Sequence, residues 1–174
     1  VGSPLTRANT QFGELHGVAG DYFSTPNVVT TWGELDIRSR AQVDSFPNGY
    51  AFLADKQGAF YFAAIAANKL KFSPILNGTQ QDFLSVSLTL VGVRLWFKVT
   101  LNTATGDVKF FTADGNLEAP AISDYVQLGT TQNTGGGSVA VTTGSFYSGT
   151  YGALPTTYPF DGDIYRSQVF NEID

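Results

Sequence analysis

The sequence predicts an all-β protein built as a two-sheet antiparallel sandwich. Three observations favour this class. Apolar and polar residues alternate along several segments, turn signals recur about every 8–12 residues, and no segment has a convincing amphipathic helical pattern. The segments add up to about ten to twelve short strands, as in known sandwiches. The 174 residues fit one domain of ordinary size.

The chain begins with a polar stretch that has no periodicity. Residues 1–11, VGSPLTRANTQ, contain one proline and predict an extended arm. We therefore expect a single β-sandwich domain over residues 12–174. No basic segment followed by an apolar one marks a signal peptide. No apolar run approaches the roughly 18 residues of a membrane span.

The first clear strand is LDIRSRAQV, residues 35–43, in which every second residue is polar. Leu35, Ile37 and Val43 share one face with Ser39 and Ala41. The opposite face carries the polar residues Asp36, Arg38, Arg40 and Gln42. Such a period of two predicts a half-buried strand. The following SFPNG, residues 45–49, is a turn signal.

Three further strands are predicted between residues 50 and 76. YAFLADK (50–56) and AFYFAAIAA (59–67) flank a turn at Gln57 and Gly58, and the Phe-Tyr-Phe lead of the second favours a strand over a helix. KLKFSPI (69–75) is a short strand that Pro74 limits. NGTQQ (77–81) is a turn.

The middle of the chain predicts a strand and a hairpin. FLSVSLTLVG (83–92) alternates, with Leu84, Val86, Leu88 and Leu90 expected on one face. GVRLWFKVTLNTATGDVKFFT (92–112) contains two strands around a Gly-ended turn. The apolar face of its first strand comprises Val93, Leu95, Phe97, Val99 and Leu101. Its other face carries Arg94, Trp96, Lys98 and Thr100.

The last third changes character. Residues 129–157 are rich in Gly, Thr and Ser and predict loops around one strand, SVAVT (138–142). DIYRSQVFNEI (163–173) is the final predicted strand. We expect Tyr165, Ser167 and Val169 on one of its faces. Arg166, Gln168 and Phe170 are expected on the other.

Three segments resemble a known family. They are LDIRSRAQV after the aromatic-rich DYFSTPN (21–27), the central hairpin with TGDVKFFTADG, and the closing GDIYRSQVFNEID. Together they resemble the concanavalin A-like lectin/glucanase superfamily in its laminin-G-like branch, as found in tailed-bacteriophage virion proteins. The closing motif rests on Gly162, Ile164, Tyr165, Arg166, Val169 and Phe170. The resemblance spans residues 12–174 and implies a two-sheet jelly roll.

Composition excludes several classes of function. The net charge is −5 and the ten Lys and Arg residues form no cluster, which disfavours nucleic-acid binding. Because the chain has no Cys, it has no disulfide, thiolate metal site or Cys nucleophile. Only 14% of residues are charged, against roughly 25% in typical soluble domains. This fits either a surface hidden against a partner or a neutral β-protein.

Catalysis is disfavoured. Glucanases that the chain resembles carry carboxylates in a pattern like E-x-D-x-x-E, in which a close pair serves as nucleophile and general acid. The nearest match is Glu34 and Asp36, but Ser39 stands where the second Glu belongs. His16 is the single histidine, and the sequence has no nucleophile-elbow motif for which it could act as the base. We therefore predict no enzyme and no catalytic residue.

A calcium site is one interpretation of four residues. The resemblance implies Ca²⁺ at the rim of the sandwich, held by oxygen ligands. Asp21, Asn27, Asp161 and Asp163 are the candidates, because first and last strands pair in this fold. The alternative is that these side chains cap turns. No other cofactor is predicted.

Cations and aromatic rings define the candidate binding face. The strand residues concerned are Arg38, Arg40, Arg94, Trp96, Lys98 and Arg166. They could hold a glycan on the Trp ring, cover that ring with their own stems, or contact a protein. We favour burial or a protein contact over a glycan site. Phe146, Tyr147 and Tyr151 lie in the loop 134–152, which is either an exposed adhesive tip or packed on the core.

The function predicted from the resemblance is structural. We expect a non-enzymatic protein on a tailed-phage virion surface, a head-decoration protein that contacts major capsid or tail proteins and copies of itself. The polar arm and the low charge content fit a protein docked on a lattice. The alternative is a carbohydrate-binding, lectin-like adhesion module that recognises a host-surface glycan. A glycosidase is the third hypothesis.

Overall fold

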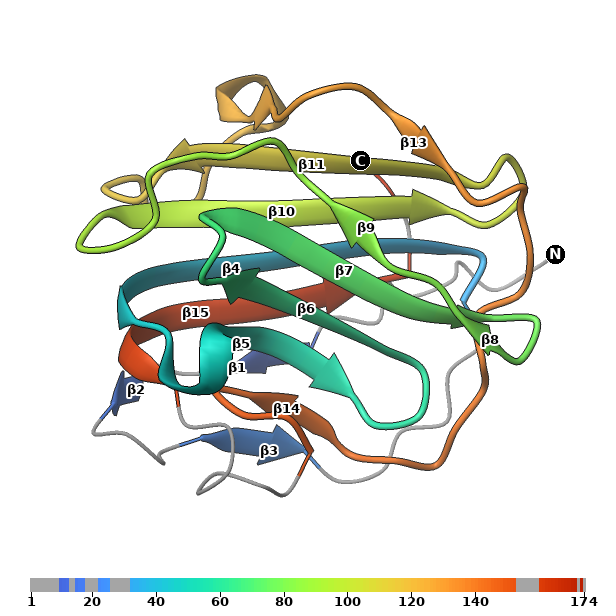
Figure 1. Cartoon of the computed structure of the whole chain (residues 1–174), viewed down its shortest axis with the longest axis horizontal. Coiled ribbons are helices and arrows are strands. Elements are labelled where there is room, and N and C mark those ends of the chain that lie inside the picture. Colours follow the sequence, from blue (N-terminus) through green and yellow to red (C-terminus); the bar gives the residue numbers. More distant parts are fainter. Residues whose placement is uncertain are drawn as a thin grey trace, which may run out of the picture.

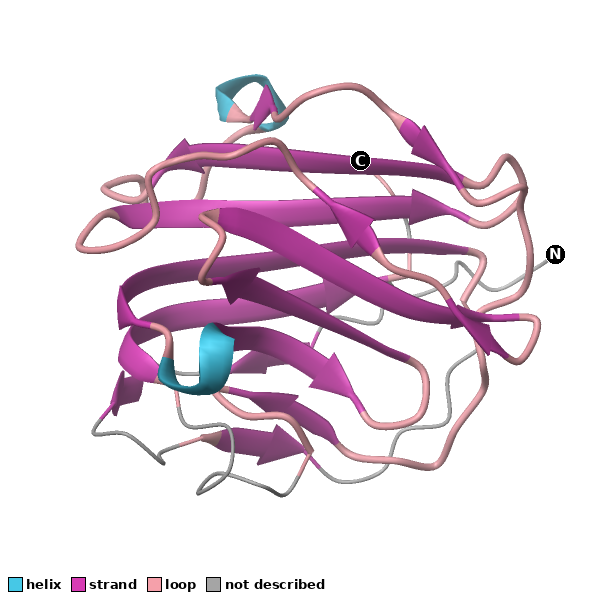
Figure 2. Cartoon of the chain, in the orientation of Figure 1, coloured by secondary structure: helices cyan, strands magenta, loops and turns pink. Residues whose placement is uncertain are grey.

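The computed structural model describes residues 10–12, 15–17, 22–25, 32–152, 160–171 and 173. Within these ranges the chain consists of strands and loops, with two single-turn 3-10 helices at Pro47–Gly49 (η1) and Ile122–Asp124 (η2) (Figure 2). None of the helices in this part is long and apolar enough to cross a membrane. The predicted all-β class is confirmed.

Sheet A contains both the first and the last described strands. The bounds of its strands are Thr10–Phe12 (β1), Leu15–Gly17 (β2), Glu34–Ser45 (β4), Arg94–Asn102 (β10), Asp107–Asp114 (β11), Val126–Gln127 (β12), Gln132–Asn133 (β13) and Asp161–Phe170 (β15). Their order is β1–β15–β4–β10–β11–β12, and β2 and β13 pair with β15 and β11. These ladders are antiparallel.

Sheet B lies in front of sheet A in Figure 1. The bounds of its strands are Phe23–Thr25 (β3), Tyr50–Lys56 (β5), Phe60–Ile65 (β6), Lys69–Leu76 (β7), Thr79–Gln80 (β8), Phe83–Leu84 (β9) and Phe146–Ser148 (β14). Their order is β3–β14–β5–β6–β7–β8, with β9 also paired to β7, and these ladders are antiparallel too. The predicted two-sheet antiparallel sandwich is confirmed.

The core fills the space between the sheets. Sheet A contributes Leu35, Ile37, Phe97, Val99 and Leu101, all at most 1% exposed. Sheet B contributes Leu53, Phe60, Phe62, Leu70 and Phe72. Each set follows the period of two in its strand, so alternation places these residues inside. Burial of this apolar surface is what holds the sheets together.

A β-bulge in β5 shapes both faces of sheet B. The pairing with β6 shifts between Phe52 and Ala54, so Leu53 is the extra residue. Its carbonyl oxygen accepts hydrogen bonds from three buried serines, with Ser148 at 2.8 Å and both Ser39 and Ser167 at 3.3 Å. These serines link β4, β14 and β15 around the bulge.

Two predicted strands are largely absent. Over residues 83–92 only β9 forms, and Leu84 and Val86 are exposed while Ser85 and Leu90 are buried. The reason is that the Ser85 hydroxyl accepts the Leu70 N–H at 2.8 Å, which turns Ser85 toward sheet B. Residues 138–142 make one isolated bridge, between Val139 and Leu76.

Three smaller predictions were also wrong. Phe146–Ser148, expected as loop, is strand β14. Thr10 and Gln11, assigned to the arm, belong to β1 and pair with β15. Tyr165 does not share the inner face with Ser167, because a register shift between Ile164 and Arg166 turns it outward.

Candidate functional site

The predicted cationic face lies on three neighbouring strands of sheet A. In the ladder between β4 and β10, Arg40 pairs with Trp96 and Arg38 with Lys98. Arg166 of β15 pairs with Arg40 from the other side. Arg94 lies at the start of β10 and donates through Nη2 to the Tyr165 hydroxyl at 2.7 Å. The fold therefore brings the predicted residues together on one face.

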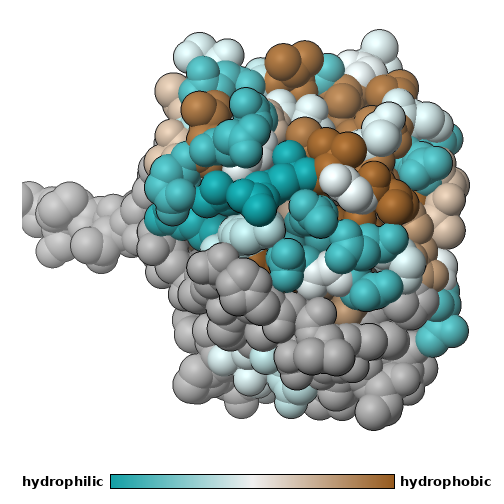
Figure 3. Space-filling model, turned by 90° about the vertical axis from the view of Figure 1, so that its left-hand side faces the viewer, coloured by the Kyte–Doolittle hydropathy of each residue, from teal (hydrophilic) through white to brown (hydrophobic). Residues whose placement is uncertain are grey.

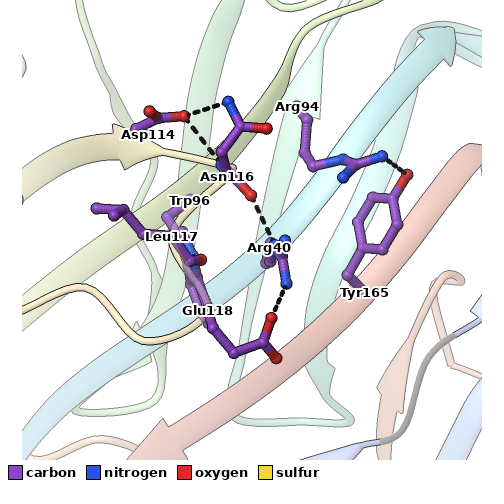
Figure 4. Close-up of polar contacts among 9 residues, drawn as sticks. Arg40, Arg94, Trp96, Asp114, Asn116, Leu117, Glu118 and Tyr165 are labelled. Atoms are coloured by element: carbon purple, nitrogen blue, oxygen red, sulfur yellow. Dashed lines mark hydrogen bonds and ion pairs between the residues drawn. The ribbon is translucent and has the colours of Figure 1, made fainter.

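That face is covered rather than open. Trp96 is only 1% exposed, and its indole N–H donates to the Leu117 carbonyl at 2.8 Å (Figure 4). Arg40 holds the same segment, donating to the Gly115 carbonyl at 2.7 Å and to the Glu118 carboxylate at 2.8 Å. Trp96 therefore presents no ring face to a ligand. This geometry disfavours a glycan on the Trp96 ring. The contact that it shows is with the segment 115–118, whereas the sequence led us to expect the Arg and Lys stems as the cover.

Lys98 and Arg38 lie in an ionic cluster under the same cover. Both contact the fully buried Asp36, with Arg38 Nε–Oδ1 at 2.9 Å and Lys98 Nζ–Oδ2 at 3.2 Å. The Lys98 ammonium also lies 5.1 Å from the ring centre of Tyr125 and 5.4 Å from that of Phe111. The buried cations are stabilised by the Asp36 carboxylate and by these aromatic rings, which offset the cost of removing them from water.

The aromatic residues of the loop 134–152 divide into two groups. Phe146 is 3% exposed and packs in the core against Trp32 and Phe60. Tyr147 is 8% exposed, on the outer face of sheet B. Tyr151 is 38% exposed, so it is the member of this group that a ligand can readily reach.

Tyr151 borders a groove on the outer face of sheet B, the face turned away from sheet A. The groove has a volume of about 200 Å³. We call it the tyrosine groove and define it by Tyr50, Phe52, Tyr61, Gln80 and Tyr151. The Phe52 ring lies at its centre, with ring-centre distances of 5.4 Å to Tyr50, 5.5 Å to Tyr61 and 5.2 Å to Tyr151.

Strand alternation and the bulge together build this groove. Tyr50 and Phe52 are two apart on β5, so both point outward. After the bulge at Leu53, Asp55 takes the outward position, where it pairs with Tyr61 of β6. Without the bulge, the alternation would turn Asp55 into the core.

A polar cluster lies at one side of the tyrosine groove. The Lys71 ammonium lies 5.7 Å from the Tyr50 ring centre and 5.6 Å from that of Tyr61, and 2.8 Å from the Asp82 carboxylate. Burial acts to lower the pKa of Lys71, but hydrogen bonds with Asp82 and Tyr61 raise it above its usual value. Gln80 donates to the same carboxylate at 3.5 Å. Lys71 thus stays charged beside the rings.

Asp55 lies in a smaller hollow that shares Tyr61, Gln80 and Tyr151 with the tyrosine groove. Its side chain is buried, and Oδ2 accepts the Gly152 N–H at 2.9 Å. Burial raises the pKa of Asp55 to about 7, although the Gly152 hydrogen bond and Lys56 act to lower it. Asp55 is therefore a buried carboxyl group that titrates near neutral pH.

The residues considered for calcium and catalysis have other roles where they are described. Asp161 accepts the Ser45 hydroxyl at 2.5 Å, and Asp163 accepts the Tyr165 hydroxyl at 3.1 Å. Asp21 and Asn27 lie outside the described residues, so the calcium site stays a prediction. Within the described ranges no three His, Cys, Asp or Glu side chains form a group that could hold a metal. Ser39, in the place of a second Glu, is buried between the sheets.

No protein-family model and no curated protein sequence matches the chain. Solved structures do match it. The CBM40 of Ruminococcus gnavus IT-sialidase, bound to α2,3-sialyllactose, aligns with a TM-score of 0.64 at 12% identity over 95% of this chain and 92% of that one. The fold is a lectin-like jelly-roll sandwich.

Two further structures support the same conclusion about the fold. A SAP-like pentraxin from Limulus polyphemus aligns with a TM-score of 0.58 at 12% identity, covering 95% of this chain and 76% of that one. Domain 4 of the Geobacillus stearothermophilus arabinanase AbnA, in complex with arabinotriose, gives 0.53 at 11% identity, covering 93% and 81%. At such identities the similarity shows the fold alone.

Most of the tyrosine groove was not predicted from the sequence. Tyr50, Phe52 and Tyr61 were used only to predict strands, and none of them was a candidate binding residue. The available signal was their spacing, since Tyr50 and Phe52 occupy alternate positions and Tyr61 follows the intervening turn. Gln80 carried no signal, because its position depends on how β8 pairs with β7.

Proposed function

We propose that the protein is a non-catalytic carbohydrate-binding domain that holds a glycan in the tyrosine groove. The observation that carries this proposal is an open aromatic groove with polar groups at its side. Aromatic rings pack against the apolar face of a sugar ring, and polar side chains bind its hydroxyl groups. Tyr50, Tyr61 and Tyr151 supply the rings, and Gln80 and Lys71 supply the polar groups.

The similar structures support this choice between the two hypotheses drawn from the sequence. The CBM40 of the R. gnavus enzyme and domain 4 of the arabinanase have carbohydrates bound in their structures. They lend weight to the carbohydrate-binding alternative over a purely structural role. The identity of the sugar is open for this chain, so the test has to begin with a broad set of glycans.

The test is a glycan array followed by isothermal titration of the best ligand. We expect Tyr61→Ala and Tyr151→Ala each to weaken binding about tenfold or more, since one lost ring contact is worth roughly 1–2 kcal/mol. Tyr22→Ala is the matched control, because Tyr22 is also 38% exposed but lies outside the groove. Unchanged binding in both groove variants would refute the assignment of this site.

The virion location and the capsid or tail partners remain predictions. One feature of the surface suits a protein contact: apolar side chains gather on one end of the sandwich (Figure 3). Exposed apolar residues of the chain include Val91, Val93 and Leu117, at 37–47%. Exposed apolar patches of this kind mark interaction sites. Light scattering of the purified protein and co-sedimentation with undecorated capsids test self-association and docking. A monomer that ignores capsids would reject both.

A further inference from the structure

A second cavity lies on the opposite sheet, outside sheet A. Its volume is about 320 Å³. Strands β10 and β11 form its floor, where Thr100 pairs with Lys109 and Lys98 with Phe111. Ile122 of η2 and Tyr125 also line it. We call it the sheet A pocket. Its volume falls at the lower end of the range for small-molecule sites, about 300–1,000 Å³.

The acidic groups at one end of the sheet A pocket are already engaged. The Glu34 carboxylate accepts the Asn102 side-chain amide at 2.8 Å and the Ile173 N–H at 3.1 Å. Asp107 Oδ1 accepts the Asn133 side-chain amide at 3.0 Å. These bonds fix the two carboxylates in place, and each carboxylate keeps capacity to accept further hydrogen bonds. Among the described residues no side-chain donor bonds to Asp107 Oδ2, so this oxygen is the most available acceptor.

Three other polar groups in the sheet A pocket have no hydrogen-bond partner within the part of the chain that the structure describes. The Tyr125 hydroxyl is buried and unpaired there. Among the described residues, neither the Thr100 hydroxyl nor the Lys109 ammonium has a side-chain hydrogen bond or ion pair. Buried polar groups are normally satisfied, so the buried Tyr125 hydroxyl beside a cavity indicates a missing partner. Thr100 and the half-buried Lys109 add polar groups that a ligand can reach.

We propose that the sheet A pocket binds a single uncharged sugar residue or a polyol of similar size. The pocket combines hydroxyl and ammonium donors with a carboxylate acceptor, which suits hydroxyl groups that both donate and accept. Two cationic and two anionic side chains line the pocket, Lys98 and Lys109 against Glu34 and Asp107. The lining therefore carries no net charge, which favours a neutral ligand over an ion. The rings of Phe111 and Tyr125 provide apolar surface for the sugar ring.

This proposal does not depend on the tyrosine groove. If both sites bind, the domain is bivalent, with one site on each sheet. Bivalent attachment raises the strength of binding to a surface that displays many glycans without any new contact.

The test is a titration of the isotope-labelled protein with glucose, galactose, mannose, arabinose and N-acetylglucosamine, followed by amide chemical shifts. We expect saturable shifts at Thr100, Lys109 and Tyr125 for at least one sugar, at millimolar concentration. Ile122→Trp places a large ring beside the cavity and should weaken this binding at least tenfold. Val126→Trp is the control, since Val126 is 67% exposed against 58% for Ile122 and does not line the pocket.

Further outcomes distinguish binding in the sheet A pocket from binding in the tyrosine groove. Tyr151→Ala should leave the shifts around the sheet A pocket intact, because Tyr151 lies on sheet B. No saturable shift there for any of the sugars at 100 mM would overturn the proposal. Shifts with sodium glucuronate or acetate but with no neutral sugar would also overturn it, because the ligand would then be an anion.

Discussion

The buried carboxyl group of Asp55 predicts how stability depends on pH. The pKa of Asp55 is about 7 in the folded protein, where the side chain is buried, against 3.8 for a free side chain. Between these values the unfolded chain is ionised at this position while the folded chain keeps its proton. The free energy of unfolding therefore falls as pH rises from about 4 to 7, and the contribution of this group to stability is lost above its folded pKa.

The size of this effect follows from the two pKa values. At about 1.4 kcal/mol per pKa unit, the difference between 3.8 and about 7 corresponds to about 4 kcal/mol. Asp55→Asn removes the titration and keeps an oxygen that accepts the Gly152 N–H. We expect the variant to gain up to about 4 kcal/mol over the wild type between pH 4 and pH 8.

Urea unfolding at pH 4.5, 6, 7 and 8 measures this difference directly. All other groups titrate alike in the variant and the wild type. The pH dependence of the difference in unfolding free energy between the two proteins therefore comes from Asp55 alone. Asp82→Asn is the control: burial acts to raise the pKa of Asp82, but hydrogen bonds from Lys71, Ser73 and Gln80 hold it below its usual value. Asp82 therefore stays ionised in both states above about pH 4, and its variant should differ from the wild type by the same amount at all four pH values. A stability difference between Asp55→Asn and the wild type that stays constant from pH 4.5 to pH 8 would show that Asp55 does not titrate in this range in the folded protein.

Two further predictions concern the cover over sheet A. A Cβ at position 115 would lie 2.3 Å from the Arg94 carbonyl oxygen. Gly115→Ala should therefore lower the free energy of unfolding by about 1–3 kcal/mol and shift Trp96 fluorescence to longer wavelength, because the segment that covers Trp96 moves away. An unshifted spectrum at wild-type stability would contradict this. Asp36→Asn leaves Arg38 and Lys98 without their buried counter-charge, and urea unfolding should show a loss of about 3–5 kcal/mol; a loss below 1 kcal/mol would show that these cations are not held by Asp36.

Burial could be predicted from the sequence in strands that have one buried and one exposed face. In β4, Leu35, Ile37 and Val43 are buried as their spacing predicts, and the Gly-ended turn before β11 has Gly106 at φ +81°. Such features depend on residues a few positions apart. For the same reason the outer face of β10 was hard to interpret. Its cover comes from Leu117, some twenty residues later, and no local pattern specifies that contact.

The tyrosine groove shows a second limit of sequence reasoning. The bulge at Leu53 reverses the side on which Asp55 lies, and one extra residue in a strand leaves no signal in the alternation of YAFLADK. Tyr151 was a candidate, but its partners Phe52 and Tyr61 come from strands about a hundred residues earlier. Of the residues that line the groove, Tyr151 alone was a candidate from the sequence, and the others are brought to it by the fold.

Glycan binding in the tyrosine groove is best tested by a crystal structure of the protein with the best ligand from the glycan array. We expect a sugar ring packed against Tyr61 and Tyr151, with hydroxyl groups bonded to Gln80 or Lys71. A glycan located instead on the face of Arg94 and Tyr165, with the tyrosine groove empty, would contradict it.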